Sequence, residues 1–209
     1  MSPKLQRPQT SAPTSLDEDF QLAKIWDLPT RLFHWLLAAS VMLGWYLGEY
    51  RTFSNIDWHM YLGQVIGWLL AFRLYWGFYG PSNAQFKNIV PTRADLFSYF
   101  KLITSRTPSG IKGHNPVGGL SVVALLIVLS IQVMSGFFAE DDGLFASGPM
   151  SKYIDDSWVL FANKIHHQSS RIILMLIILH FAAIAFYHLW KRENLISPMI
   201  SGWKWVRSK

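Results

Sequence analysis

The chain has 209 residues, of which 51% are apolar and 15% charged, and it contains no cysteine. A charged fraction below the roughly 25% of soluble domains favours a bilayer environment, and the lack of cysteine excludes disulfides, thiolate zinc sites, iron–sulfur clusters and covalently attached haem. The net charge of +6 does not indicate a nucleic-acid partner, because the basic residues flank apolar runs, as in a membrane protein.

The two ends of the chain are polar or basic. Residues 1–23 lack the apolar centre of a signal peptide and are expected to form a disordered cytoplasmic tail. The transmembrane domain is expected at 24–192. Residues 193–209 carry Trp203 and Trp205 among basic residues, which predicts a cytoplasmic tail at the membrane interface.

Four apolar runs are long enough to cross a bilayer, which takes roughly 20 helical residues. They are Leu32–Tyr50, Trp58–Tyr79, Val117–Phe138 and Val159–Trp190. The expected fold class is therefore all-α, an integral membrane bundle of four helices. A short amphipathic surface helix is expected over Thr92–Thr104, which begins with a sequence similar to a capping box.

Lysine and arginine gather before the first run, between the second and third runs, and after the fourth. The other two connections are poor in positive charge. The one after the third run holds the acidic residues Glu140, Asp141, Asp142, Asp155 and Asp156. The positive-inside rule therefore predicts that both termini are cytoplasmic.

Four of the seven histidines lie where they could bind a metal together. His166 and His180 share one helix face, roughly 21 Å apart along the axis, and so lie near opposite surfaces of a hydrocarbon core roughly 30 Å thick. His34 begins the first run on the inner side, and His59 begins the second on the outer side. The predicted pairs are His34 with His180 and His59 with His166. Two imidazoles without an open position suit electron-transfer haem, whereas the alternative is simple hydrogen bonding between helices.

Three arginines at similar depths are candidates to contact haem propionates or a quinone. Arg31 lies at the inner start of the first run, Arg73 at the inner end of the second, and Arg171 in the outer part of the fourth. For Arg31 the alternative is snorkelling to lipid headgroups. His167 and His188 are rotated by about 100° and about 80° from the paired histidines and are not expected to be ligands.

These positions resemble the bacterial cytochrome b561 family, which includes the b-type cytochrome subunits of membrane-bound nickel–iron hydrogenases. The motifs are Trp-Asp-x-x-x-Arg-x-x-His-Trp at 26–35, His59 followed by Gly63 and Arg73, and Leu-His at 179–180, with the histidine fourteen residues after His166. The resemblance implies two haem b groups stacked across the bilayer of the bacterial inner membrane. It also implies quinone chemistry.

The turn before the third run is a candidate quinone site. The family is similar to the b subunit of formate dehydrogenase, where a quinone analogue lies beside the inner haem near an Asn and a Gly. His114, Asn115 and Gly118 occupy that place here. The same residues are typical of a turn that opens a helix, and both interpretations stay open.

The expected function is electron transfer across the membrane between a quinone pool and a periplasmic partner, either a c-type cytochrome or a hydrogenase-like enzyme subunit. Membrane lipid and quinone are the other expected partners. One alternative is a self-sufficient superoxide:quinone oxidoreductase, which needs a basic funnel at the outer haem. Another is a bundle without a cofactor.

Overall fold

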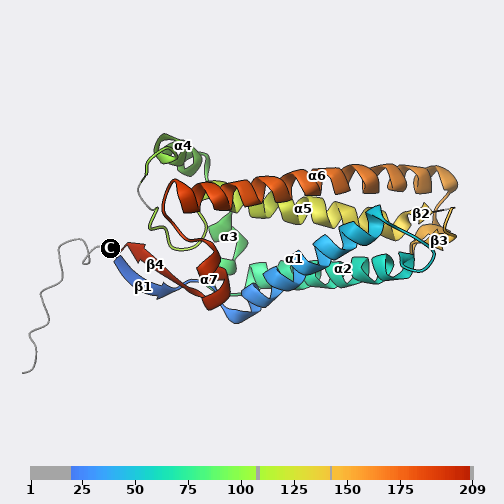
Figure 1. The fold of residues 1–209 in the computed structure, drawn as a ribbon, viewed down its shortest axis with the longest axis horizontal. Coiled ribbons are helices and arrows are strands. Elements are labelled where there is room, and N and C mark those ends of the chain that lie inside the picture. The colour runs from blue at the N-terminus through green and yellow to red at the C-terminus, as the bar shows by residue number, and fades with distance from the viewer. Residues whose placement is uncertain (1–19, 107–108, 142, 208–209) are drawn as a thin grey trace, which may run out of the picture.

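Four long helices account for most of the chain. The computed structural model describes residues 20–106, 109–141 and 143–207. The long helices lie side by side along the longest axis of the molecule (Figure 1), and they are α1 (Leu28–Glu49), α2 (Ile56–Tyr79), α5 (Pro116–Phe138) and α6 (Asp156–Leu189). α1 packs on α2, α5 on α6, and α2 on α5. Each apolar run expected from the sequence coincides with one of these helices, which confirms the helical bundle.

Side-chain caps stabilise the starts of several helices. The carboxylate of Asp27 accepts hydrogen bonds from the backbone N–H of Thr30 at 3.4 Å and from its hydroxyl at 2.6 Å, at the start of α1. Thr92 and Asp95 form a complete capping box at the start of α4 (Arg93–Leu102), as the sequence predicts. Each such cap contributes about 1 kcal/mol, because it satisfies N–H groups that have no partner within the helix.

The centre of the bundle is a small apolar core formed by Ile66, Leu70, Leu129, Val133 and Ile173. Most other large apolar side chains face outward. In the most apolar stretches of α5 and α6, only 11% of the residues are buried, and both helices are long and apolar enough to cross a membrane. A water-soluble bundle would not expose this much apolar surface, so the surface is that of a protein surrounded by lipid.

Both ends of the described chain meet at one end of the bundle. β1 (Phe20–Lys24) pairs antiparallel with β4 (Trp203–Arg207), with Leu22 opposite Trp205, and α7 (Ile196–Ser201) precedes β4. The sequence did not predict this ribbon, which occupies parts of both expected tails. Residues 1–19 of the expected disordered tail lie outside the described residues. We call this end inner and the opposite end outer, after the orientation that the charges predict.

A buried ion pair holds the inner end together. Lys204 Nζ lies 2.7 Å from Glu193, and the two side chains are only 9% and 7% exposed. Glu193 also accepts hydrogen bonds from the backbone N–H and hydroxyl of Ser109, and Lys204 donates to the Ile111 carbonyl. Burial alone would raise the pKa of Glu193, but the hydrogen bonds from Lys204 and Ser109 lower it below its ordinary value. We call β1, α7, β4 and residues 109–115 the inner cap.

The outer end is closed by a hairpin of β2 (Glu140–Asp141) and β3 (Ala146–Ser147). Asn163 of α6 exchanges two hydrogen bonds of 3.0 Å with the backbone of Glu140, and Arg51 lies 2.7 Å from Asp141. These contacts hold the acidic hairpin over the end of the bundle. The remaining short elements are η1 (Ser82–Ala84), α3 (Phe86–Ile89) and η2 (Ser151–Tyr153).

Candidate metal centres

The four candidate ligands meet as two pairs, in the combination that the sequence predicts. The ring centroids of His59 and His166 are 6.1 Å apart, and those of His34 and His180 are 6.5 Å apart. Two imidazoles bound on opposite sides of one metal, each through a nitrogen roughly 2 Å from it, would have centroids roughly 6 Å apart. The separations of both pairs therefore fit a haem iron between the rings.

Each pair offers two ligands and no third. Among the residues that the structure describes, no group of three or more His, Asp or Glu side chains is close enough to hold a metal ion. A metal ion held by protein alone usually takes three or four protein ligands. A haem iron needs only the two axial ones, because the porphyrin supplies the rest.

The outer pair has its tautomers set by backbone carbonyls. His59 Nδ1 lies 2.8 Å from the Gly44 carbonyl, and His166 Nδ1 lies 3.0 Å from the Gln132 carbonyl. A carbonyl oxygen can only accept, so Nδ1 of each ring carries the proton. The lone pair that can bind a metal is then on Nε2, and fixing it this way is how proteins orient metal-binding histidines.

The side chain of Gln132 adds a second contact to His166. Its Nε2 lies 3.0 Å from His166 Nε2 and can donate to the lone pair there, a contact that a metal bound at this nitrogen would replace. Its Oε1 accepts a short hydrogen bond from Ser169. Gln132 therefore contacts His166 through both its backbone and its amide. Periodicity in the sequence does not identify this residue, because glutamine carries no metal-ligand signature.

Two glycines lie directly against the outer imidazoles. A Cβ atom added at Gly48 of α1 would stand 2.8 Å from Cε1 of His59, and one added at Gly136 of α5 would stand 2.9 Å from Cε1 of His166. Real Cβ atoms do not approach other atoms so closely. Each ring of the outer pair thus occupies its place because the neighbouring helix has no side chain at that point.

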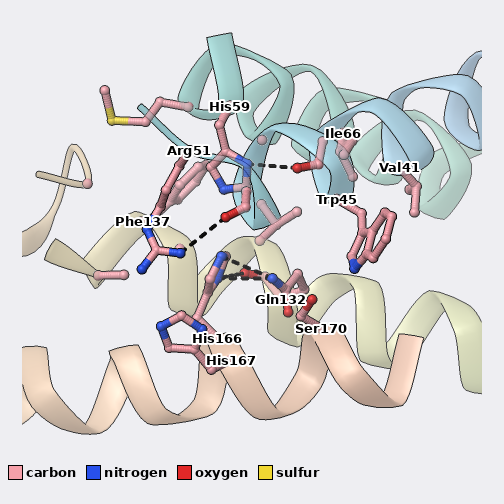
Figure 2. A pocket seen from close by; sticks show the side chains of 18 of the residues that line it. Val41, Trp45, Arg51, His59, Ile66, Gln132, Phe137, His166, His167 and Ser170 are labelled. Atoms are coloured by element: carbon pink, nitrogen blue, oxygen red, sulfur yellow. Dashed lines mark hydrogen bonds between the residues drawn. The ribbon is translucent and has the colours of Figure 1, made fainter. Parts of the chain in front are cut away.

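A cavity of about 240 Å³ surrounds the outer pair (Figure 2). It is lined by α1, α2, α5, α6 and the outer hairpin, and its walls include Trp45, Phe137 and Ser170. Figure 2 shows His59 and His166 approaching each other across it from α2 and α6, with Arg51 beside them. The sequence pattern does not identify Arg51, because it lies in the loop between α1 and α2, where helical spacing gives no information. His167 also lines the cavity, although its ring is not part of the pair.

The inner pair lies beneath the inner cap. His34 comes from the start of α1 and His180 from the last third of α6. The Nδ1 atom of His34 is buried and has no hydrogen-bond partner among the described residues. A buried polar atom without a partner is costly, so this ring is suited to a ligand that the protein chain does not supply.

The three candidate arginines have different surroundings. Arg73 is 4% exposed, and its Nη2 donates to the Ala84 carbonyl at 3.0 Å while its Nη1 has no partner among the described residues. Arg31 donates through Nη1 to the Ile200 carbonyl at the end of α7, which ties α1 to the inner cap. Arg171 is exposed and does not line the cavity, because it is five residues, or about 140° of helix rotation, from His166.

The candidate quinone residues form the start of α5. The Asn115 side chain accepts from the Gly118 N–H at 2.7 Å and donates to the hydroxyl of Tyr187 at 2.9 Å. The His114 ring packs on Trp26 with centroids 4.7 Å apart, and its Nδ1 is buried without a partner among the described residues. Asn115 is therefore the helix cap that one of the two interpretations predicted.

The His114 ring is neutral at physiological pH. Burial, first of all, and the positive charges of Arg73 and Lys204 together lower its pKa to about 4. A neutral imidazole can donate through one nitrogen and accept through the other. His114 is thus chemically able to hydrogen-bond either a carbonyl or a hydroxyl group.

Comparison with known proteins identifies relatives of the whole bundle. A family model described as prokaryotic cytochrome b561 matches residues 25–202. A probable Ni/Fe-hydrogenase B-type cytochrome subunit of Azotobacter vinelandii is 25% identical over 211 aligned positions, which cover 86% of this chain and 87% of that protein. The corresponding protein of Cupriavidus necator is 21% identical, with 98% of each chain covered. No solved structure matches the chain.

The match agrees with the motifs and with the geometry of the bundle. The range 25–202 contains all four paired histidines and all four long helices. It covers most of the chain, and it confirms the resemblance that the motifs indicated. The chain belongs to the prokaryotic cytochrome b561 family.

Proposed function

We propose that the protein is a di-haem b-type cytochrome that transfers electrons across the bacterial inner membrane between a quinone pool and a redox partner on the outer side. The observation that carries the proposal is the pair of facing imidazole sets, with centroid separations of 6.1 and 6.5 Å. They lie at different depths, because His166 and His180 are roughly 21 Å apart along one helix.

The protein's part in this function is ligation, orientation and burial. His34 with His180 would hold the inner haem b, and His59 with His166 the outer one. Haem supplies one-electron redox chemistry when bound. If both histidines of a pair held the haem, neither site would leave a position for oxygen, as expected for electron transfer.

The proposed topology has four spans and cytoplasmic termini. α1, α2, α5 and α6 are each long enough to cross, and the basic segments lie on the side of the inner cap. A reporter enzyme that is active only in the cytoplasm, fused to the C-terminus, should be active. An inactive fusion that folds normally would contradict this orientation.

The proposed quinone site is at the inner end, next to the inner pair. His114 supports it, because its Nδ1 is buried without a hydrogen-bond partner among the described residues. Asn115 and Gly118 form the adjoining turn. A quinone headgroup needs a hydrogen-bonding group for each carbonyl oxygen, and His114 with Asn115 can supply them.

The proposed partner is a nickel–iron hydrogenase or another external redox protein. The names of the relatives from Azotobacter vinelandii and Escherichia coli describe subunits of Ni/Fe hydrogenases. The acidic residues of the outer hairpin give that end a surface suited to a basic partner. Three of the four charged residues that line the outer cavity, Glu49, Glu140 and Asp141, are acidic. This lining is unlike the basic funnel that superoxide oxidation would need.

Counting the haems tests the proposal. A pyridine haemochrome assay on the purified protein should give two protohaems per chain, with six-coordinate low-spin spectra and little binding of carbon monoxide. A ratio near zero or one would contradict a di-haem cytochrome.

A further inference from the structure

We propose that Arg51, assisted by His167, is the carboxylate-binding group of the outer site and pairs with the propionates of the haem held there. The proposal rests on the proposed function, since it assumes a haem at His59 and His166. It assigns to a loop residue of the α1–α2 connection the role that the sequence suggested for Arg171.

Arg51 stands at the border between the cavity and the outer surface. It lines the cavity around His59 and His166, and it also lines a shallow surface depression together with Glu49, Asp141, Gly143 and Leu144. Its side chain is 42% exposed. Haem propionates are the charged edge of an otherwise apolar group, so they are expected at this border and not in the apolar interior.

Arg51 is the one Lys or Arg among the described residues that line this cavity. The other charged side chains of the lining, Glu49, Glu140 and Asp141, are acidic and would repel a propionate. Arg51 is therefore the residue of the lining best able to receive a carboxylate. His167 of α6 also lines the cavity, and Figure 2 shows its ring below the guanidinium of Arg51, where it can add a hydrogen bond to the same carboxylate.

The guanidinium is held in place by two neighbours. Its Nε donates to Asp141 Oδ2 at 2.7 Å, and its Nη1 donates to the Gly48 carbonyl at 3.2 Å near the C-terminal end of α1. Nη2 has no hydrogen-bond partner among the described residues. Gly48 is also the glycine that contacts the His59 ring, so Arg51 is fixed relative to a ligand of the outer pair. A guanidinium oriented in this way is suited to a carboxylate.

The charge of Arg51 has a measurable consequence. A positive charge beside a haem favours the reduced form, whose net charge is lower, and so raises the midpoint potential. Arg51→Gln should lower the midpoint potential of the outer haem and leave that of the inner haem unchanged. Asp141→Asn should raise the same midpoint potential, because it removes the competing negative charge.

Redox titration of the purified full-length protein tests the proposal, with the outer haem assigned as the one missing from His59→Ala. Lys164→Gln is the matched control, because Lys164 is an exposed cation in the outer half of α6 that does not line the cavity. If Arg51→Gln prevents haem binding at the outer site, Arg51→Lys should restore it.

Three results would overturn the inference while the protein still holds two haems. One is a midpoint potential of the outer haem that is the same in Arg51→Gln as in Lys164→Gln. Another is a shift confined to the inner haem. The third is loss of the outer haem in both Arg51→Gln and Arg51→Lys, which would mean that Arg51 acts through the end of α1. A wild-type protein with fewer than two haems would instead contradict the proposed function itself.

Discussion

At the scale of single residues, the outer site depends on two positions that have no side chain. Gly48 and Gly136 each leave room for one imidazole. Gly48→Ala and Gly136→Ala should displace His59 and His166 respectively, because a Cβ would overlap the ring. We expect each variant to lose the outer haem and keep the inner one, as measured by haem content and reduced spectra.

Gly67→Ala is the control for this prediction. A Cβ at Gly67 would stand 3.3 Å from Cγ1 of Val133, a contact that a small shift relieves, and Gly67 does not line the cavity. It should retain both haems. Equal loss of the outer haem in all three variants would show that the effect comes from general helix packing.

Asn115 needs a test that separates two roles, since its side chain caps α5 and also contacts Tyr187. Asn115→Leu removes the cap at a cost of about 1 kcal/mol, so a slow reaction in that variant would be ambiguous. Asn115→Ser keeps an oxygen for the cap and removes the amide. It should slow reduction of the inner haem by a quinol analogue in stopped-flow measurements, with haem content unchanged.

Tyr187→Phe is the matched variant, because it leaves Asn115 in place and removes only its partner. We expect the quinol analogue to reduce the inner haem of Tyr187→Phe at nearly the wild-type rate. If the inner haem is reduced at the wild-type rate in Asn115→Ser and slowly only in Asn115→Leu, Asn115 acts as a helix cap alone and the quinone binds elsewhere.

The pairing of the four candidate ligands could be predicted from the sequence, but the surroundings of the pairs could not. Fourteen residues between His166 and His180 make nearly four helical turns, which is enough to place both on one face. Arg51 and Gln132 carry no comparable pattern. Their roles depend on which loop and which helix face meet the rings, and that is fixed only by the packing of α1, α2, α5 and α6.

At the scale of elements, the four long helices and α4 follow from apolar length and caps, and the structure has them within a few residues of the expected bounds. The β1–β4 ribbon could not be predicted in this way. Its two strands are separated by nearly the whole chain, and each is short and mixed in polarity. Only the folded bundle brings them together.

The buried pair of Glu193 and Lys204 should stabilise the inner cap. Lys204→Met leaves a buried carboxylate without its cation, and removing one partner of such a pair costs roughly 3–5 kcal/mol. Hydrogen exchange of β1 and β4 should therefore accelerate strongly. Lys24→Met, at an exposed lysine of the same ribbon, should have little effect.

The same pair predicts a pH dependence. The pKa of Glu193 in the folded protein lies below its value in the unfolded chain, so the contribution to stability is complete above the ordinary glutamate range and is lost as the pH falls through the lowered value. In the wild type, the protection of the β1–β4 ribbon from hydrogen exchange should fall as the pH is lowered. Glu193→Gln should flatten this dependence, and an unchanged profile in that variant would assign the effect to another group.

At the scale of the whole molecule, the helices differ in how clearly they indicate a membrane. α5 and α6 are both long and apolar enough to cross a membrane, whereas α1 and α2 are also long enough but less apolar. The difference lies in their Trp, Tyr, His and Arg residues, several of which belong to the candidate sites. The functional residues therefore weaken the hydropathy pattern of the helices that carry them, as is usual for polar groups in membrane proteins.

The pairing of the four histidines is the central claim, and haem content in single substitutions tests it most directly. His34→Ala and His180→Ala should each remove the same haem, and His59→Ala and His166→Ala the other, while His167→Ala and His188→Ala should keep both. Spectra of the reduced variants identify which haem remains. Loss of different haems in His34→Ala and His180→Ala, or loss of haem in His188→Ala but not in His180→Ala, would contradict the pairing.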